Sequence, residues 1–370
     1  MIAVVGLLLG LLPISANPQI IENPAKPPAA NAGRVVTVRE EMRIEDTGKD
    51  FTFTSVWDIK VAADGTIFVK DGNQQVLQFD PGGKFIRNLM KKGQGPGELN
   101  SVDSIFLAER RSLLQGIPPK ILAFDFHGKL LEETNLASAG GRIRLLVGAG
   151  PTDFYLSRRG LFDPGQGTGW IDFPEEIVEI SPKNNSVKVV GVFPIKSYIK
   201  VTSSGRGGVA GGMMFHSLII VPFGESKFVV NSTPEYEVTI FDAARIEVIL
   251  RFRRVYERVV RKNAGRAFGS INGQPGPEIP KYRSDIAALN VVDGRLWIQT
   301  STVDAKKGVL FDIFDAEGRY VDCFYLKYSK KDIDPDSFKR FFFANGFVYF
   351  SDTTEDEFIV IKKGALVGLK

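Results

Sequence analysis

The sequence contains very little cysteine and histidine, and this limits the chemistry that it can carry. Cys323 is the one cysteine among 370 residues, so the chain can form neither an intramolecular disulfide nor a cysteine-based zinc cluster. The two histidines, His127 and His216, leave little scope for a histidine-rich metal site. Cys323 lies in the strand-like segment Tyr320–Phe324, where we expect it to pack as a small apolar residue.

The sequence also has no large excess of positive or negative charge. The chain has 47 basic and 43 acidic residues and a net charge of +4, which gives no reason to expect a nucleic-acid partner. Hydrophobic residues make up 44% and charged residues 24%, so the composition is that of a folded protein. Among the aromatic residues, 28 are Phe against 9 Tyr and 3 Trp, which favours a β-rich core.

Long apolar runs are absent except at the N-terminus, where residues 3–12 read AVVGLLLGLL. This run is shorter than the roughly 20 residues of a membrane span, and Ser15 and Ala16 follow it. The pattern predicts a signal peptide of residues 1–16 and a protein exported to the periplasm or the cell exterior. No basic residue precedes the run, so an uncleaved N-terminal anchor is the alternative. Residues 17–33 are rich in Pro and Ala and predict a linker, which leaves residues 34–370 as the folded domain.

An internal repeat is the strongest signal in the remaining chain. Its clearest copy, residues 57–84, has three short apolar segments separated by turn residues, namely Ile59–Val61, Ile67–Val69 and Val76–Phe79, and a fourth segment begins at Phe85–Ile86. The same order recurs at residues 293–319 and 345–364, and more weakly in three central copies. The third apolar segments end at Phe79, Phe124, Ile180, Phe241, Phe314 and Ile361. These ends are 45 to 73 residues apart, and the longer intervals contain loop-like insertions at residues 160–169, 203–212 and 263–280.

Six four-stranded units without helices between them predict an all-β, six-bladed β-propeller with antiparallel blades. Each unit alone would expose an apolar face and two sheet edges, and packing the blades around an axis buries those faces. We expect the ring to be closed by residues 34–38, paired with the last blade beside Phe358–Ile361. The alternative is that Leu366–Val367 supplies the final strand.

The repeat and the segment that follows it also resemble a known family. The Asp-Gly turn at 64–65, the Phe-Asp-x-x-Gly-Lys turn at 79–84 and the connector KGQGPGE at 92–98 together look like bacterial six-bladed propellers related to NHL-repeat and TolB-like proteins. The resemblance is strong in the first blade, good in the last two and weak in the others. It implies the fold and export, but no single activity, because relatives bind peptides, sugars, RNA or proteins and a few are enzymes.

Several polar residues are expected to gather at one mouth of the channel. They stand at the starts of the innermost strands, which cluster around one mouth in a propeller. They are Asp58, Asp103, Arg144, His216, Asp285 and Arg340. Such a ring could hold a calcium ion, a carboxylate or a sugar hydroxyl. The alternative is a set of hydrated, mutually paired charges lining a wet channel.

Other motifs favour structural roles. The glycine-rich segments 93–98 and 273–278 lack the ending of a phosphate-binding loop and are expected to connect blades. Asp71, Asn231 and Asp352 follow second strands and are expected to shape turns through local backbone bonds. The basic segment Arg251–Arg266 predicts a solvated connector, with a short amphipathic helix or contact with an anionic surface as alternatives.

These observations favour a monomeric, non-catalytic binding or scaffolding propeller over an enzyme. Its ligand would be a protein, peptide or glycan of the cell envelope, presented to the inserted loops. The alternative is a calcium-dependent hydrolase or lactonase with its site at the channel mouth, for which Asp58, Asp103 and Asp285 supply part of a ligand set. A quinone-dependent dehydrogenase ranks lowest, since no local signature of that cofactor is present. No cofactor is predicted beyond that calcium ion.

Overall fold

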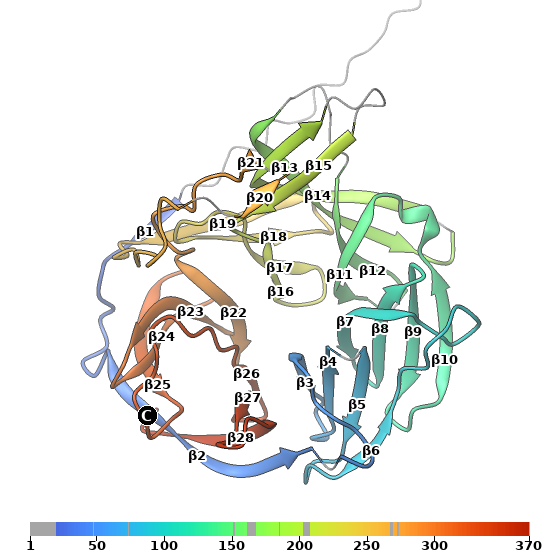
Figure 1. Ribbon diagram of the computed structural model, residues 1–370, viewed down its shortest axis with the longest axis horizontal. Coiled ribbons are helices and arrows are strands. Elements are labelled where there is room, and N and C mark those ends of the chain that lie inside the picture. The colour runs from blue at the N-terminus through green and yellow to red at the C-terminus, as the bar shows by residue number, and fades with distance from the viewer. Residues whose placement is uncertain are drawn as a thin grey trace, which may run out of the picture.

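The computed structural model describes residues 20–369, except residues 47, 73, 151, 161–167, 185, 203–207, 267–268 and 272–273. In this part of the chain, six blades of β-strands surround a central axis, as Figure 1 shows. The helical element among these residues is the 3-10 turn η1 (Ala137–Ala139), and none of them form a helix of the length and hydrophobicity that a bilayer span needs. The six-bladed, antiparallel architecture predicted from the repeat is therefore confirmed.

The first three blades follow one another along the chain. The first blade consists of β3 (Val56–Val61), β4 (Ile67–Asp71), β5 (Gln75–Phe79) and β6 (Phe85–Asn88). The second consists of β7 (Ser101–Ala108), β8 (Arg111–Ile117), β9 (Lys120–Asp125) and β10 (Leu130–Asn135). The third consists of β11 (Arg142–Ala149), β12 (Phe154–Arg159), β13 (Gly169–Ser181), β14 (Ser186–Thr202) and β15 (Gly208–Met214).

The other three blades continue the same pattern. The fourth consists of β16 (Ile219–Pro222), β17 (Lys227–Asn231), β18 (Glu237–Asp242) and β19 (Glu247–Arg254). The fifth consists of β22 (Ile286–Val292), β23 (Arg295–Asp304), β24 (Gly308–Phe314) and β25 (Tyr320–Lys327). The sixth contains β26 (Phe342–Ala344), β27 (Phe347–Thr353) and β28 (Ile359–Val367). A small hairpin, β20 (Ser270–Ile271) and β21 (Gln274–Pro275), lies in the connector between the fourth and fifth blades.

The core of the protein is divided among the blade interfaces. One cluster of buried apolar side chains lies between each pair of neighbouring blades, and the cluster between the sixth and first blades includes Phe51, Phe79 and Tyr349. Many of the largest fully buried side chains are Phe, as the aromatic composition indicated. The faces that a single blade would expose are therefore buried by its neighbours.

A recurring turn explains why the repeat was visible in the sequence. In the first, second and fifth blades, the third strand ends in Phe-Asp-x-x-Gly followed by Lys or Arg. The Asp side chain accepts a hydrogen bond from the backbone N–H four residues later, at 2.9 Å for Asp80, 2.8 Å for Asp125 and 2.8 Å for Asp315. The Gly has a positive φ in each copy, from 73° to 86°, which an L-residue rarely adopts. The motif thus determines a tight turn between the third and fourth strands.

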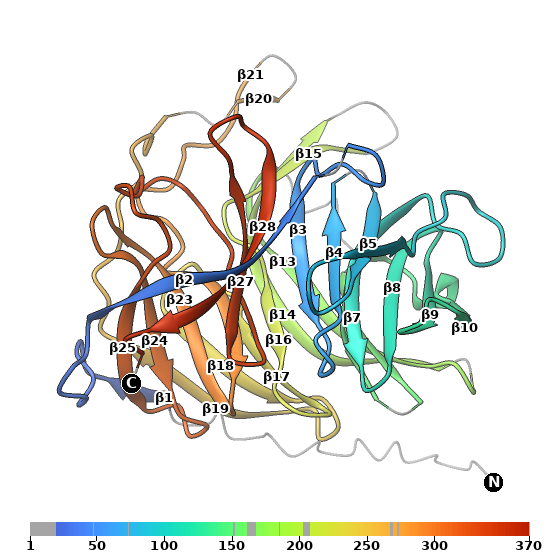
Figure 2. The same cartoon turned by 90° about the horizontal axis from the view of Figure 1, so that it is seen from below.

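The ring is closed by the N-terminal strand β2 (Arg34–Glu45), shown in Figure 2 crossing the outside of two blades. Residues 34–37 pair in parallel with β25, and residues 37–45 pair antiparallel with β28. The prediction of closure by this strand is confirmed, but the register differs from the predicted one: Ile44, not Val35–Val38, lies opposite Ile361. β28 continues through Leu366–Val367, the residues that the alternative placed in the final strand.

Part of the segment predicted as a linker is a strand. β1 (Ile20–Asn23) pairs in parallel with the outer strand β19 of the fourth blade. Buried Asn23 donates to the backbone oxygens of Arg253 and Gly318 at 3.0 Å and accepts from the N–H of Tyr320 at 2.9 Å. The segment therefore joins the fourth blade to the fifth.

Two of the predicted insertions contain strands. Residues 208–212 belong to β15, and together with the long strands β13 and β14 they form an extension that projects from the ring (Figure 1). The hairpin of β20 and β21 belongs to the insertion 263–280, and Figure 2 shows it projecting from the same face as β15. Residues 161–167 of the remaining insertion lie outside the described residues.

The structural roles predicted for the glycine-rich segments, for the Asp and Asn residues after second strands and for Cys323 are confirmed only in part. Residues 93–98 connect the first and second blades without a helix, as expected, whereas Gly273 of the second glycine-rich segment lies outside the described residues. Asn231 bonds local backbone oxygens as predicted. Asp71 accepts from the backbone of Thr54 and Ser55, and Asp352 pairs with two lysines, so the turn-shaping prediction is wrong for Asp352. Cys323 is buried in β25, as predicted.

Candidate functional site

The six residues predicted at a channel mouth all lie at the starts of innermost strands. Asp58, Asp103 and Arg144 are near the beginnings of β3, β7 and β11, and the other three lie within the few residues that precede β16, β22 and β26. Because the chain enters every blade at its innermost strand, the starts of these strands face the same end of the axis. They do not form one cluster, however, and the structure divides them among four local environments.

The first environment surrounds Lys70, a buried lysine of β4. Burial lowers its pKa, and the nearby carboxylates of Asp58 and Asp103 oppose that shift. The Lys70 ammonium also lies 4.2 Å from the ring centroid of Trp57. Arg340 donates to the backbone oxygen of Trp57 at 3.4 Å, so it belongs to the same group. Two predicted carboxylates and one predicted arginine therefore meet around a lysine that sequence reasoning did not identify.

The second environment is a buried carboxylate between two arginines. Glu175 of β13 has no exposed side-chain area, and it accepts from Arg144 at 2.8 Å and from Arg159 at 3.3 Å. A buried carboxylate requires such partners to remain charged. Arg144 is thus held against the third blade by an ion pair.

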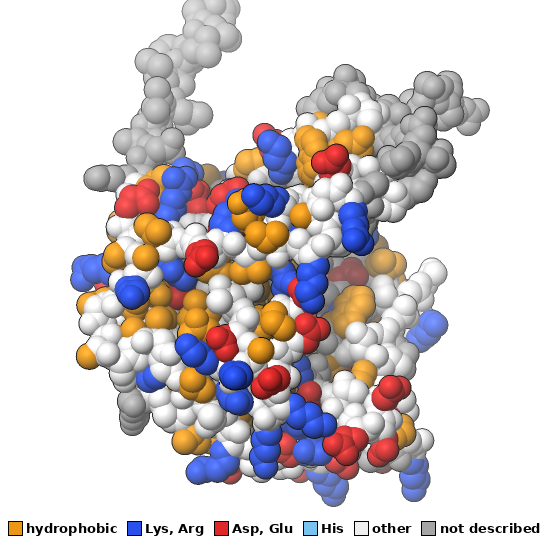
Figure 3. Space-filling model, turned by 60° about the vertical axis from the view of Figure 1, so that its left-hand side comes forward, with side chains coloured by type: hydrophobic (Ala, Val, Ile, Leu, Met, Phe, Trp, Pro, Cys, Tyr) orange, Lys and Arg blue, Asp and Glu red, His pale blue; other side chains and the backbone are white. Residues whose placement is uncertain are grey.

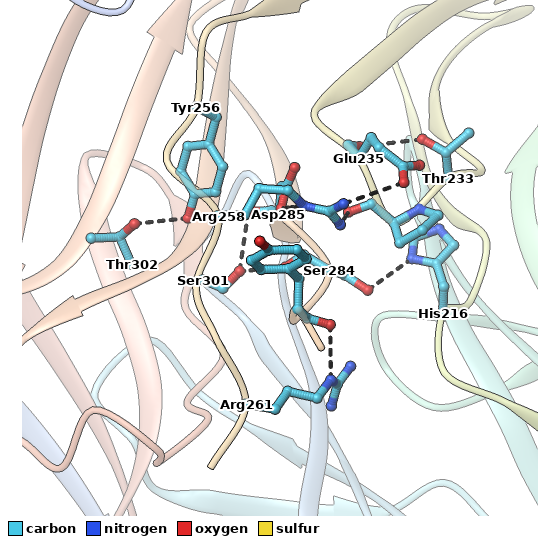
Figure 4. Close-up of polar contacts among 12 residues, drawn as sticks. His216, Thr233, Glu235, Tyr256, Arg258, Arg261, Ser284, Asp285, Ser301 and Thr302 are labelled. Carbon is cyan, nitrogen blue, oxygen red and sulfur yellow. Dashed lines mark hydrogen bonds and ion pairs between the residues drawn. The ribbon is translucent and has the colours of Figure 1, made fainter. Parts of the chain in front are cut away.

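The remaining two environments lie between the fourth and fifth blades, shown in Figure 4. Burial lowers the pKa of His216 to about 4, and its Nδ1 lies 3.1 Å from the hydroxyl of Ser284. Asp285 accepts from Arg258 at 2.9 Å, and Arg258 also pairs with Glu235 at 3.4 Å. His216 is therefore engaged with a residue of the following connector, whereas Asp285 is engaged with Arg258 of its own connector.

This arrangement bears on the calcium alternative. Asp285 pairs with Arg258 and does not join Asp58 and Asp103. Among the described residues, no group of three or more His, Cys, Asp or Glu side chains is arranged to hold a metal ion. The residues present do not fit the calcium set that the sequence allowed.

Two adjoining cavities open where the connectors after the third, fourth and fifth blades meet. The larger, here named the mouth cavity, has a volume of about 670 Å³. Its charged lining side chains are five cations and one carboxylate, namely Arg261, Lys262, Arg283, Lys339, Arg340 and Asp336. Lys262 and Arg283 pair with Asp336, and Lys339 pairs with Asp352 at 2.6 Å. Arg261 and Arg340 form no ion pair with the described residues.

The smaller, here named the aromatic cavity, has a volume of about 310 Å³. Trp170 of β13, Phe215 and Tyr282 line it, and Trp170 is 44% exposed. Its charged lining residues are Lys196, Arg258, Arg261, Lys281 and Glu235. Arg258 and Lys281 each lie about 5 Å from the ring centroid of Tyr282, at 4.9 and 5.1 Å. Phe215, His216, Arg261 and Ser284 line both cavities, which therefore share a wall.

The basic segment Arg251–Arg266 contributes to this site in a way that the sequence did not show. Its first four residues form the end of β19, so the prediction of a connector is wrong there, and no part of it is helical. Arg258, Arg261 and Lys262 line the cavities. The sequence signal that could have identified it was the high density of arginine in this segment, which lies in the longest interval between repeat copies.

On the face of the molecule shown in Figure 3, charges of both signs are mixed. Figure 3 shows Lys and Arg side chains interspersed with Asp and Glu side chains over one face of the molecule. This agrees with the small net charge of the chain. The cationic lining of the two cavities is therefore a local feature.

Comparisons with known proteins agree with the fold. A protein-family model described as a 6-bladed beta-propeller matches residues 45–141. A search of curated proteins found no match. Among solved structures, an exported protein from Bacteroides fragilis is similar at 11% identity, over 94% of this chain and 99% of that one, with a TM-score of 0.54.

Two further structures are more distant. BamB from Moraxella catarrhalis matches at 12% identity over 85% of this chain and 73% of that one, with a TM-score of 0.33. YCF48 bound to a D1 peptide matches at 11% identity over 91% and 98%, with a TM-score of 0.45. The sheet order, the interblade cores and the family model together show that the chain is a six-bladed β-propeller.

Proposed function

We propose that the protein is an exported binding propeller that holds a peptide segment of a cell-envelope partner protein in the aromatic cavity. The observation that carries this proposal is the half-exposed Trp170 beside Phe215, Tyr282 and Arg258 in one concave site. Tryptophan, tyrosine and arginine are the residues most often found at the energetic centres of protein interfaces. Phe215, Arg258 and Tyr282 lie on connectors of a rigid ring, where binding residues commonly occur.

The proposal also includes export, a relationship to a propeller family and a role without catalysis. Export rests on the N-terminal apolar run followed by small residues. A relationship to NHL-repeat and TolB-like propellers rests on the turn and connector motifs of the first blade. We propose a binding role without catalysis, because Glu175 and Asp285, two buried carboxylates at the mouth, are each held by an arginine.

A peptide fits the aromatic cavity better than a neutral carbohydrate does. Sugar hydroxyl groups require convergent acceptors, and the described lining of this cavity includes no Asn, Gln or Asp side chain. Its carboxylate, Glu235, accepts from Arg258, and its serine contacts His216. An apolar or aromatic side chain of a peptide would instead bury the exposed face of Trp170.

The test is selection of peptides from a random library displayed on phage, using the folded chain as bait. Selected peptides should bind the wild-type protein and bind Trp170→Ala and Tyr282→Ala at least tenfold more weakly. Trp57→Ala, which removes a 55% exposed tryptophan of the first blade, is the matched control and should bind like the wild type. Peptides that bind all variants equally, or a selection that yields no binder, would contradict the proposal.

A further inference from the structure

The cations of the two cavities are not balanced by carboxylates of the protein. In the described part of the chain, Arg261 forms no ion pair, and its Nε donates to the backbone oxygen of Tyr282 at 3.0 Å. Burial and the like charge of Arg283 lower the pKa of Arg261. A cation that is partly removed from water beside another cation gains most from an added anion.

The neighbouring cations reinforce this imbalance. Lys196 and Lys281 line the aromatic cavity and form no ion pair among the described residues, and both are exposed. Arg340 stands across the mouth cavity with contacts to a backbone oxygen and to the ring of Phe338. The carboxylates in the two linings, Glu235 and Asp336, already pair with Arg258 and with Lys262 and Arg283.

Arg261 lies in the wall shared by the two cavities, and so it is adjacent to the aromatic side chains on one side and to Arg283 and Arg340 on the other. A guanidinium binds a carboxylate with two parallel hydrogen bonds, whereas an aromatic surface accepts an apolar side chain. Both recognition elements are therefore present within one continuous concave site.

We infer that the bound segment is an acidic peptide, with an apolar or aromatic side chain against Trp170 and Tyr282 and a neighbouring carboxylate on Arg261. This inference rests on the proposed function and specifies its ligand. The peptide runs from the aromatic cavity toward the mouth cavity, where Arg340 receives a second acidic side chain. The aromatic wall gives affinity for the anchor, and the uncompensated cations select for acidic sequence.

The test uses three fluorescein-labelled decapeptides that share a central Phe. In the first peptide Asp and Glu flank the Phe, in the second Asn and Gln replace them, and in the third Lys does. Binding to the full chain is followed by fluorescence anisotropy at 50 and 300 mM salt. We expect the acidic peptide to bind at least tenfold more tightly than the amide peptide, with a difference that shrinks at high salt.

Variants of Arg261 test the contribution of its charge separately from that of the aromatic wall. Arg261→Gln should weaken the acidic peptide about tenfold and leave the amide peptide unchanged, whereas Arg261→Lys should retain part of the preference. Arg295→Gln, an exposed arginine at the start of β23 on the opposite mouth, is the matched control and should have no effect. Thermal unfolding of each variant shows whether a loss of binding comes from a loss of folding.

The outcomes distinguish this inference from the proposed function. Equal binding of acidic and amide peptides, lost in Trp170→Ala but kept in Arg261→Gln, would overturn the inference and retain the peptide-binding proposal. Binding of an oligogalacturonate that depends on Arg261, without binding of any peptide, would overturn both in favour of an acidic glycan. Failure of all these probes to bind would also reject both.

Discussion

At the scale of single residues, the ion pair of Arg254 and Asp312 is the most deeply buried charge pair described in the protein. The Arg254 guanidinium donates to Asp312 at 2.7 Å, with side-chain exposures of 6% and 0%. Tyr236 and Tyr320 donate to the same carboxylate at 2.7 and 2.6 Å. Burial raises the pKa of Asp312, and Arg254 and the two hydroxyls oppose this shift. The pair joins β19 of the fourth blade to β24 of the fifth.

Arg254→Ala should therefore destabilise the protein strongly. It leaves the Asp312 carboxylate buried without its cation, which costs about 3–5 kcal/mol of unfolding free energy. Arg253→Ala is the matched control, because Arg253 is 46% exposed and pairs with Glu237 at the surface, so its loss should cost less than about 1 kcal/mol. Urea unfolding monitored by tryptophan fluorescence measures both, and equal losses would show that the buried pair has no special role.

His216 predicts a dependence of stability on pH. Its pKa is about 4 in the folded protein and about 6.5 in the unfolded chain, because burial disfavours the charged ring. Between these values the unfolded state binds more protons, so stability falls as pH decreases from 6.5 to 4, by about 3 kcal/mol for this residue. His216→Gln should remove this component, whereas His127→Gln, at an exposed position, should not. Urea titrations at pH 7, 5.5 and 4.5 provide the comparison, and an unchanged acid loss in His216→Gln would refute it.

At the scale of elements, the N-terminal segment has a larger structural role than its composition indicates. Proline and alanine around Ile20–Asn23 give no strand periodicity, and the two isoleucines alone are too short a signal. The strand forms because β19 offers an open edge and because Asn23 bonds backbone groups of two blades. Tertiary partners, not local preference, determine this element.

Asn23→Ala tests the assignment of β1. The substitution leaves two buried backbone oxygens and the N–H of Tyr320 without their partner, which should lower the unfolding free energy by about 1–3 kcal/mol. Glu22→Ala, at the exposed adjacent position of the same strand, should change stability by less than about 0.5 kcal/mol. Chemical unfolding of both variants gives the answer. Similar stabilities would indicate that the segment is a tether.

The same contrast explains how much of the site the sequence could predict. The blade turns were visible because Asp80 or Asp315 bonds its own turn and the following Gly supplies a positive φ, both of which are local requirements. The starts of the inner strands could also be predicted, because the repeated turns showed where each blade begins. The aromatic cavity was not visible, because Trp170 comes from β13 of the third blade and Tyr282 from the connector after the fourth blade, and the two meet only in the folded ring. No local pattern encodes that meeting.

At the scale of the whole molecule, β2 connects the two ends of the chain. It extends the fifth blade through residues 34–37 and the sixth through residues 37–45, so the two blades form one continuous eight-stranded sheet. Closure holds the inner strands around the axis and thereby places the three connectors of the site at one mouth. The cavities depend on this arrangement, because their walls come from blades three to five and from the connectors that follow them.

The most direct test of this arrangement is a disulfide engineered between β2 and β28 in their observed register. The experiment uses a chain in which Ala replaces Cys323. Arg39 lies opposite Ala365 in the observed register, so the pair Arg39→Cys and Ala365→Cys should oxidise within the monomer and stabilise it by about 2–4 kcal/mol. The control pair, Arg39→Cys and Ile359→Cys, is separated by six residues along β28, about 20 Å, and should remain reduced. Crosslinking of the control pair but not of the first pair would show that the ring closes in another register or not through β2.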